Sequence, residues 1–330
     1  MSRETQGYVP PEAMEPQKGA EISEAELTYR NAEEYMGRLM HSSSYERQAG
    51  EKGREILVSR EDGGERYELG QIHAPFDPAF EGVHKVLQNI PMRIESLNEM
   101  RTWPAFDVGI FYIRDPQNKN GKDRHTEIAA NVVGYLPIKK VNSEEQEGIL
   151  AAWYAATNPE YKDKRLTDEG FPNALKFGLE KAKKYGHAFK AVVAEGFDGR
   201  LELLGSREER GTEKIRMFYK KNGALIEVPY QEPLKGYNLH LLVKTFDGRD
   251  AMSTSELLDI VRTLYIDYDV PEKKWRPAYE RLERELLEAE NNEVSFLSFK
   301  DRKMLESEGQ EIILQESPLE KKRRESRSKR

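Results

Sequence analysis

Cysteine is absent from the chain of 330 residues. Its absence excludes disulfides, thiolate nucleophiles and zinc sites built on cysteine, and it fits a reducing compartment. The chain also lacks a long apolar run, because no stretch approaches the ~20 residues that a membrane-spanning helix needs. Its first residues, MSRETQGYVPPEAMEPQKGAEISEAEL, contain no apolar core of a signal peptide. We therefore expect a cytoplasmic protein without a membrane partner.

Two further absences concern possible partners. The six histidines show no short metal-binding spacing such as HxxxH, so we expect no metal. The formal net charge of −7 leaves no overall positive field, which argues against nucleic acid as a partner of the whole chain. The basic tail over 320–330 leaves two interpretations open, a solvated terminus or a contact with RNA or an acidic protein.

The composition indicates a folded domain with polar extensions. The chain is 37% hydrophobic, 34% charged and 9% aromatic, which is polar but still supplies a packed core. We expect a disordered or loosely helical N-terminal arm over 1–50, with one amphipathic helix over 24–40. The folded domain should span 51–270, and 271–330 should form a helical C-terminal extension that ends in the basic tail.

Hydrophobic patterning predicts the elements of this domain. Alternating or continuous apolar runs predict strands over 54–60, 107–115, 127–141, 149–159, 189–196, 224–230 and 237–246. Apolar positions at helical spacing predict helices over 80–90, 93–103, 172–186, 212–222, 253–268 and 272–290. Pro172 should lie in the first turn of its helix and Gly186 just beyond the end. The β-α-β-α-β order in the middle predicts an α/β (α+β) fold, a mixed sheet with helices on both faces.

Four stretches resemble the GNAT superfamily of N-acetyltransferases. They are AAWYAATNPEY (151–161), YKDKRLTDEGFPNALKFGLEKAKKYG (161–186), AVVAEG (191–196) and IRMFYKKNGALIEVPY (215–230). The resemblance covers roughly 54–246. It implies the acyl-CoA N-acyltransferase fold, a mainly antiparallel sheet with a central splayed parallel strand pair. It also implies acetyl-CoA as co-substrate and an amine as acceptor.

The resemblance also implies which residues hold acetyl-CoA. The backbone of the central strand would lie along the pantetheine, and the following loop and helix would take the pyrophosphate. The implied residues are Ala155, Ala156, Thr157, Lys162, Lys164, Arg165, Gly170 and Asn173. Gly170 is the one glycine where the family's loop has more, so the basic residues would supply charge in place of close backbone contacts.

Two candidate catalytic residues keep alternative interpretations. The resemblance places Tyr219 near the coenzyme thiol, where its hydroxyl would protonate the leaving thiolate, but Tyr219 could equally be a packing residue. Its neighbour Phe218 has no polar group and is expected to be the buried member of the pair. Glu195 ends a predicted strand and could activate the amine, or it could be a solvated carboxylate; Glu127 is a weaker candidate for the same role.

The function predicted from these features is direct transfer of an acetyl group from acetyl-CoA to an amine. Two alternatives remain. The chain could be a catalytically silent GNAT-like binding module, or an interaction protein whose helices over 253–290 dock a partner. The sequence indicates neither the acceptor amine nor the oligomeric state.

Overall fold

The computed structural model describes residues 23–51, 54–61, 64–74, 107–117, 127–138, 146–196, 223–231, 238–267, 271–288 and 292–297. The strands in these ranges are β1 (Tyr45–Ala49), β2 (Glu55–Ser59), β3 (Arg66–Ala74), β4 (Asp107–Arg114), β5 (Glu127–Pro137), β6 (Glu147–Thr157), β7 (Ala188–Gly196), β8 (Ala224–Gln231), β9 (Asn238–Thr245), β10 (Ala251–Ser253) and β11 (Glu293–Leu297). The helices are α1 (Glu24–His41), the 3-10 helix η2 (Pro159–Lys164), α4 (Leu166–Tyr185), α6 (Thr254–Asp267) and α7 (Glu272–Glu288).

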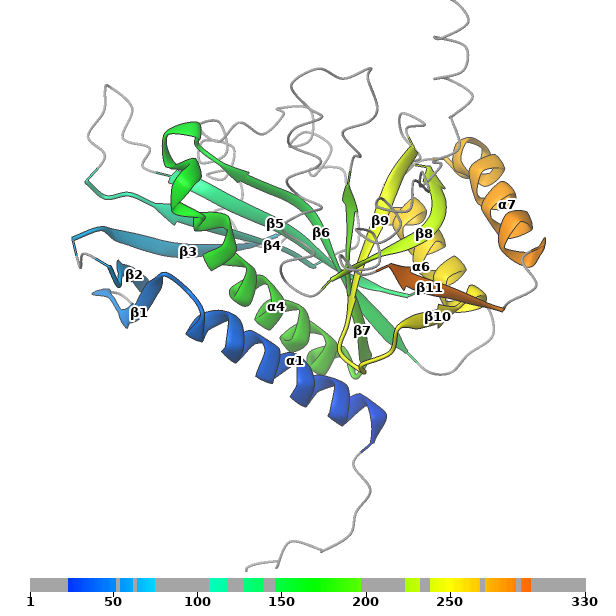
Figure 1. Ribbon diagram of the computed structural model, residues 1–330, viewed down its shortest axis with the longest axis horizontal. Coiled ribbons are helices and arrows are strands. Elements are labelled where there is room, and N and C mark those ends of the chain that lie inside the picture. The colour runs from blue at the N-terminus through cyan, green and yellow to red at the C-terminus, as the bar shows by residue number, and fades with distance from the viewer. Residues whose placement is uncertain are drawn as a thin grey trace, which may run out of the picture.

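The described strands form an 11-stranded sheet in the order β1-β2-β3-β4-β5-β6-β7-β9-β8-β11-β10 (Figure 1). β6 and β7 run parallel, and the other neighbouring strands of the described sheet run antiparallel. α4 connects the two parallel strands, as a parallel pair requires. The predicted mixed, mainly antiparallel sheet with a central parallel pair is therefore confirmed.

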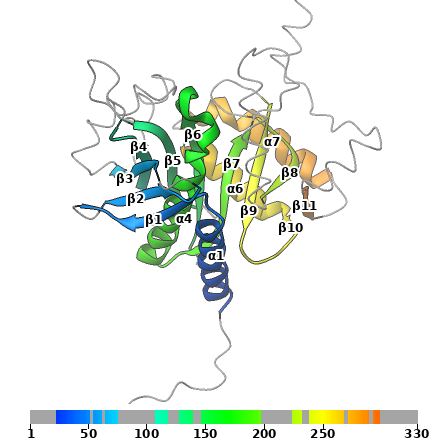
Figure 2. The ribbon, with the colours of Figure 1, turned by 60° about the vertical axis from the view of Figure 1, so that its left-hand side comes forward.

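Helices cover both faces of the sheet, as predicted (Figures 1 and 2). On one face, Tyr35 of α1 and Leu175 of α4 pack in one buried cluster with sheet residues such as Phe189. On the other face, the buried cluster contains side chains of α6 and α7, including Val261 and Leu282. The strand alternation that sends successive side chains to opposite faces supplies both cores from the same strands.

The helix expected over 172–186 begins earlier, at Leu166. Leu166 and Thr167 are buried, so the apolar face of α4 already contacts the sheet before the proline. Pro172 therefore lies inside the helix and not in its first turn, at the cost of one backbone N–H donor. The C-terminus agrees with the prediction, because Gly186 ends α4 at φ 69°, a left-handed conformation that favours glycine.

Segments outside the expected domain limits pack on the same sheet. In the expected N-terminal arm, 24–41 form α1, whose Ala32 and Tyr35 are buried, and β1 pairs with β2 across residue 50. In the expected C-terminal extension, α7 contributes to the core beside α6, and β11 pairs with β8. The division at residues 50 and 270 stays a prediction. The helices expected over 80–90, 93–103 and 212–222 and the basic tail lie outside the described residues.

Four short or polar strands, β1, β3, β10 and β11, were not predicted. Their sequences YERQA, RYELGQIHA, AMS and EVSFL contain few apolar residues in a row. In β3, Tyr67 and Leu69 are buried and alternate with polar residues, a period-2 signal that could have been found. β1 and β10 lie at the ends of the sheet, where backbone hydrogen bonds to one neighbour define the strand.

Candidate active site

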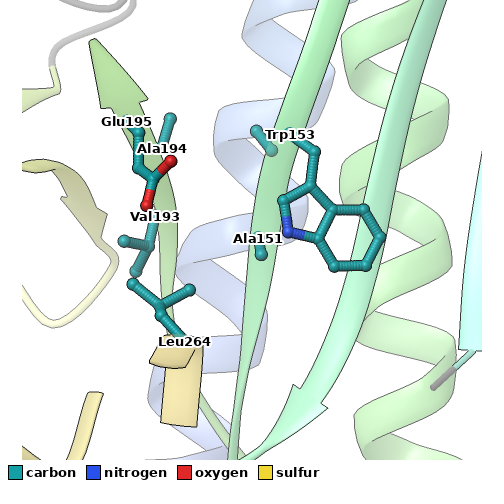
Figure 3. Close-up of a pocket in the computed structure, with 7 residues that line it drawn as sticks. Ala151, Trp153, Val193, Ala194, Glu195 and Leu264 are labelled. Carbon is teal, nitrogen blue, oxygen red and sulfur yellow. The ribbon is translucent and has the colours of Figure 1, made fainter. Parts of the chain in front are cut away.

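The parallel strands β6 and β7 diverge at their carboxyl ends. Their ladder ends at the pair Ala152–Ala194. Beyond it, β6 continues to Thr157 along β5, and β7 continues to Gly196 along β9. The opening between them is a pocket lined by Ala151, Ala152, Trp153, Val193, Ala194, Glu195 and Leu264 (Figure 3). The splayed pair that the sequence predicted is thus present, and ligands commonly bind at such carboxyl ends.

Trp153 enters the opening through a β-bulge. In the pairing of β5 with β6, Val132 faces Tyr154 and Val133 faces Ala152, so Trp153 is the extra residue. Figure 3 shows its indole beside the opening, on the side of β5. A Cβ at Gly134 of β5 would lie 1.8 Å from Cη2 of Trp153, so only glycine leaves room for this ring position. The bulge therefore turns a large aromatic ring toward the site.

Glu195 lines the opposite side of the opening (Figure 3). It pairs in register with Leu241 of β9, a member of the core cluster beneath α6 and α7, so its side chain lies on that face of the sheet. The hydroxyl of Tyr230 on β8 donates a hydrogen bond to the Glu195 carboxylate. Tyr230 is 0% exposed, whereas Glu195 is half-buried. Glu195 is therefore a carboxylate at the site with a buried donor.

The segment between β6 and α4 carries the predicted basic residues. Asn158 caps η2, with its Oδ1 accepting from the backbone N–H of Glu160 at 3.1 Å. Lys164 forms an ion pair with Glu65. Arg165 is exposed and adopts φ 52°, a left-handed conformation that is rare for any residue other than glycine. Lys162 lies within η2, between Asn158 and Lys164 in the chain.

Gly170 lies where α4 comes closest to β5. A Cβ at Gly170 would lie 2.3 Å from Nδ2 of Asn131, and that amide donates a hydrogen bond to the Thr167 carbonyl at 2.8 Å. Asn173 accepts a hydrogen bond from Nη1 of Arg47 at 2.7 Å. The structure thus places Gly170 and Asn173 in contacts between α4 and the sheet, and their contact with coenzyme stays a prediction.

The first turn of α4 is acidic. It contains Asp168 and Glu169, and the Glu169 carboxylate accepts a hydrogen bond from Oγ of Ser43 at 2.5 Å. Arg47 donates from Nη2 to the Glu169 carbonyl at 2.6 Å. Acidic side chains stabilise a helix N-terminus, and they repel a second anion there. The pair of acids after Arg165 was the sequence signal for the early helix start, and it was missed.

The remaining predicted site residues separate into three groups. Ala155, Ala156 and Thr157 form the end of β6 beyond the parallel ladder. Glu127 is buried and paired with Arg114, and it is not among the residues that line the opening. Tyr219 and Phe218 lie outside the described residues, so their roles stay predictions. The sequence analysis singled out neither Trp153, which lines the opening, nor Tyr230, which contacts Glu195 there.

The described residues also bear on metal binding and on membrane insertion. No group of three or more His, Cys, Asp or Glu side chains gathers there in an arrangement that could hold a metal ion. Among the described helices, none combines the length and apolar character required to cross a membrane.

The chain is similar to solved structures of N-acetyltransferases. Arabidopsis thaliana NAA60 in complex with acetyl-CoA is 10% identical, with a TM-score of 0.34, over 53% of this chain and 99% of that one. Histone acetyltransferase HPA2 and related acetyltransferase from Corynebacterium glutamicum is 12% identical, with a TM-score of 0.28, over 54% of this chain and 96% of that one. No protein-family model and no curated protein matches the chain.

Proposed function

We propose that the chain is an acetyl-CoA-dependent N-acetyltransferase that transfers an acetyl group directly to an amine. The observation that carries the proposal is the opening between β6 and β7 with the Glu195 carboxylate inside it. The resemblance of the sequence stretches at β6, α4, β7 and β8 adds support. A cytoplasmic location, expected from the cysteine-free sequence, stays a prediction.

The end of β6 fits the amide-rich arm of a coenzyme. Where parallel strands diverge, backbone N–H and C=O groups that would otherwise pair face the gap. Ala155 has a small side chain and lies on β6 beyond the end of the parallel ladder. When bound, acetyl-CoA would supply a thioester-activated acetyl group. We assign the polarisation of the acetyl carbonyl to a backbone N–H near Ala156 or Thr157.

Glu195 would accept the proton that an amine loses when it becomes nucleophilic. A general base must lie within hydrogen-bond reach of the reacting group, and the place of Glu195 in the lining of the opening supports this role. Tyr219 keeps its predicted role as the acid that protonates the leaving thiolate. Lys162, Lys164 and Arg165 remain the residues proposed for the pyrophosphate, at the segment that joins β6 to α4.

One observation favours the catalytically silent alternative. Asp168 and Glu169 place two carboxylates in the first turn of α4, close to the proposed position of the pyrophosphate. Like charges would weaken coenzyme binding there. A protein with weak coenzyme affinity and an intact sheet would serve as a binding or interaction module.

Calorimetric titration of the full chain with acetyl-CoA separates these functions. We expect binding, and we expect Lys164→Glu with Arg165→Glu to weaken it by more than 10-fold, or ~1.4 kcal/mol. Absence of binding by the parent protein would refute the acetyltransferase and leave the interaction protein.

A turnover assay with a panel of primary amines, in which the released free thiol is measured, tests the chemistry. Glu195→Gln and Tyr219→Phe should each lower kcat by about 10²–10⁴-fold, while calorimetry shows acetyl-CoA binding unchanged. Binding without turnover on any amine of the panel would favour the silent module.

A further inference from the structure

Tyr230 contacts Glu195 although their strands are not neighbours. β9 lies between β7 and β8. In register, Tyr230 lies opposite Leu239 and Glu195 lies opposite Leu241, so the phenol side chain crosses β9 to reach the carboxylate. Both side chains lie on the face that α6 and α7 cover. The hydroxyl thus reaches the candidate base from the core side of the opening.

The ring of Tyr230 is itself held by aromatic residues of the two C-terminal helices. Tyr265 of α6 stacks on it, with ring centroids 5.7 Å apart and planes at 27°. Trp275 of α7 packs against Tyr265 at 5.7 Å, and Tyr279 packs against Trp275 at 5.9 Å. Tyr230 and Tyr265 are both 0% exposed. A buried ring that is stacked in this way has one orientation, and its hydroxyl has a fixed position.

We propose that Tyr230 is a positioning residue that keeps the Glu195 carboxylate ionised and oriented at the opening, and that the stack on α6 and α7 fixes Tyr230 for this role. A hydroxyl that donates to a carboxylate stabilises the charged form and restricts its rotamers. The inference rests on the proposed function, and it gives the C-terminal helices a part in it.

Four other ionisable side chains on β9, α6 and α7 can be placed relative to this contact among the described residues. Glu195 is the one ionisable side chain among the described residues that line the opening. His240 of β9 lies opposite Gly196, next in register to the Glu195–Leu241 pair, so it faces the other side of the sheet. Asp259 and Arg262 of α6 and Glu283 of α7 influence Tyr279, which lies at the far end of the stack from Glu195.

The pH dependence of kcat/KM tests the role of the hydroxyl. Glu195 must be ionised to act as a base, so its protonation defines the acidic limb of the profile. Because Tyr230→Phe removes a donor to the ionised form, we expect the acidic limb to move to higher pH by about one unit. We also expect kcat to fall by about 10-fold, with KM for acetyl-CoA unchanged. Tyr185→Phe is the control, since it removes a hydroxyl that donates to Asp107, away from the opening.

A second substitution keeps the test decisive if Tyr230→Phe does not fold. 3-Fluorotyrosine at position 230 retains the ring and is a stronger hydrogen-bond donor, so the acidic limb should move to lower pH. In the background of Glu195→Gln, Tyr230→Phe should cause little further loss of kcat, because residues that act through one another are not additive. An acidic limb that is the same in all variants, or fully additive losses of kcat, would overturn the positioning role.

An NMR titration of ¹³C-labelled glutamate carboxyls, with Glu195 assigned through Glu195→Gln, separates failure of this inference from failure of the proposed function. The expected result is a Glu195 titration that moves to higher pH in Tyr230→Phe and is unchanged in Tyr185→Phe. If the titration moves but the parent protein transfers no acetyl group, the contact is as proposed and the acetyltransferase is refuted. If the parent is active and the titration does not move, the role of Tyr230 is refuted alone.

Discussion

At the scale of single residues, two close contacts within the fold can be tested by substitution. Trp153 occupies its place because Gly134 has no side chain. The carboxylate of Asp107, at the start of β4, accepts hydrogen bonds from Lys181 and Tyr185 of α4. The first contact joins β5 to β6, and the second joins β4 to α4. Each of them suggests a substitution whose effect can be measured.

Gly134→Ala should displace the Trp153 indole. The added Cβ would lie 1.8 Å from Cη2 of the ring, so the ring or the strand must move. We expect unfolding in urea to show a loss of about 1–3 kcal/mol, together with a changed tryptophan fluorescence spectrum of the native state. Gly37→Ala is the control, because nothing lies within 4 Å of its added Cβ and α1 should gain about 0.5–1 kcal/mol. Equal stability of both variants would mean that Trp153 moves freely.

Asp107→Asn should destabilise the protein at neutral pH and not at acidic pH. Burial raises the pKa of Asp107. The hydrogen bonds from Lys181 and Tyr185 and the charges of Lys181 and Lys184 together lower it by more, so the pKa lies below its ordinary value. A depressed carboxyl pKa contributes stability above the unfolded-state pKa, and this contribution is lost as pH falls through the folded-state pKa.

We expect the free energy of unfolding in urea to be about 1.5 kcal/mol higher for the parent than for Asp107→Asn at pH 7. This difference should shrink below about pH 4. Glu34→Gln removes a 57% exposed partner of Arg30 and should change stability by less than about 0.5 kcal/mol at both pH values. A difference for Asp107→Asn that stays constant with pH would contradict the electrostatic cause.

At the scale of elements, Arg47 links strand β1 to helix α4 by hydrogen bonds. Its side chain is 12% exposed, and the guanidinium donates to Oε2 of Glu55 at 2.9 Å, to Oδ1 of Asn173 at 2.7 Å and to the carbonyl of Glu169 at 2.6 Å. The planar fork of arginine reaches all three acceptors at once. The N-terminal half of α4, which follows the opening in the chain, is thus held by a strand far away in the sequence.

Arg47→Ala should cost about 2–4 kcal/mol, because it removes the charged donor to Glu55, Asn173 and the Glu169 carbonyl, although Nδ2 of Asn173 still donates to Glu55 at 3.3 Å. Hydrogen exchange should accelerate in the first two turns of α4. Arg54→Ala is the matched control, since Arg54 is 49% exposed and pairs with Glu68 at 3.0 Å, and it should cost less than about 1 kcal/mol. If the two variants unfold at the same urea concentration, β1 does not secure α4.

At the scale of the whole molecule, one sheet receives elements from both ends of the described chain. β1 lies at one end of the strand order, and β11 and β10 lie at the other. The core on one face includes Trp275, Leu282 and Leu286 of α7, which are 6%, 2% and 6% exposed. The segment expected as a C-terminal extension therefore supplies apolar surface to the core beside the opening.

Deletion of 271–330 tests whether the domain limit at residue 270 holds. Loss of three buried large side chains should remove at least about 4 kcal/mol, a large part of the stability of an ordinary domain. We expect a lower Tm and a broader calorimetric transition than for the full chain. A truncated protein with the Tm of the full chain would instead support an independent folding unit over 51–270.

The type and order of the long apolar elements follow from local patterns in the sequence. Runs such as EGILAAWYAAT in β6 and AFKAVVAEG in β7 are apolar enough to be strands in any compact arrangement, and Gly186 ends α4 through its own backbone preference. These features depend on local periodicity and on single-residue conformations. For the same reason the mixed sheet and the position of Glu195 at a strand end were predictable.

Which side chains meet depends on how the strands and helices are arranged in space. Tyr230 reaches Glu195 from 35 residues away, and Arg47 reaches Asn173 from 126 residues away. Periodicity assigns a side chain to a face of the sheet, but it does not say which strand lies beside it, so the place of β9 between β7 and β8 could not be predicted. The bulge at Trp153 and the strand at YERQA likewise depend on hydrogen bonds to distant partners, which no local pattern contains.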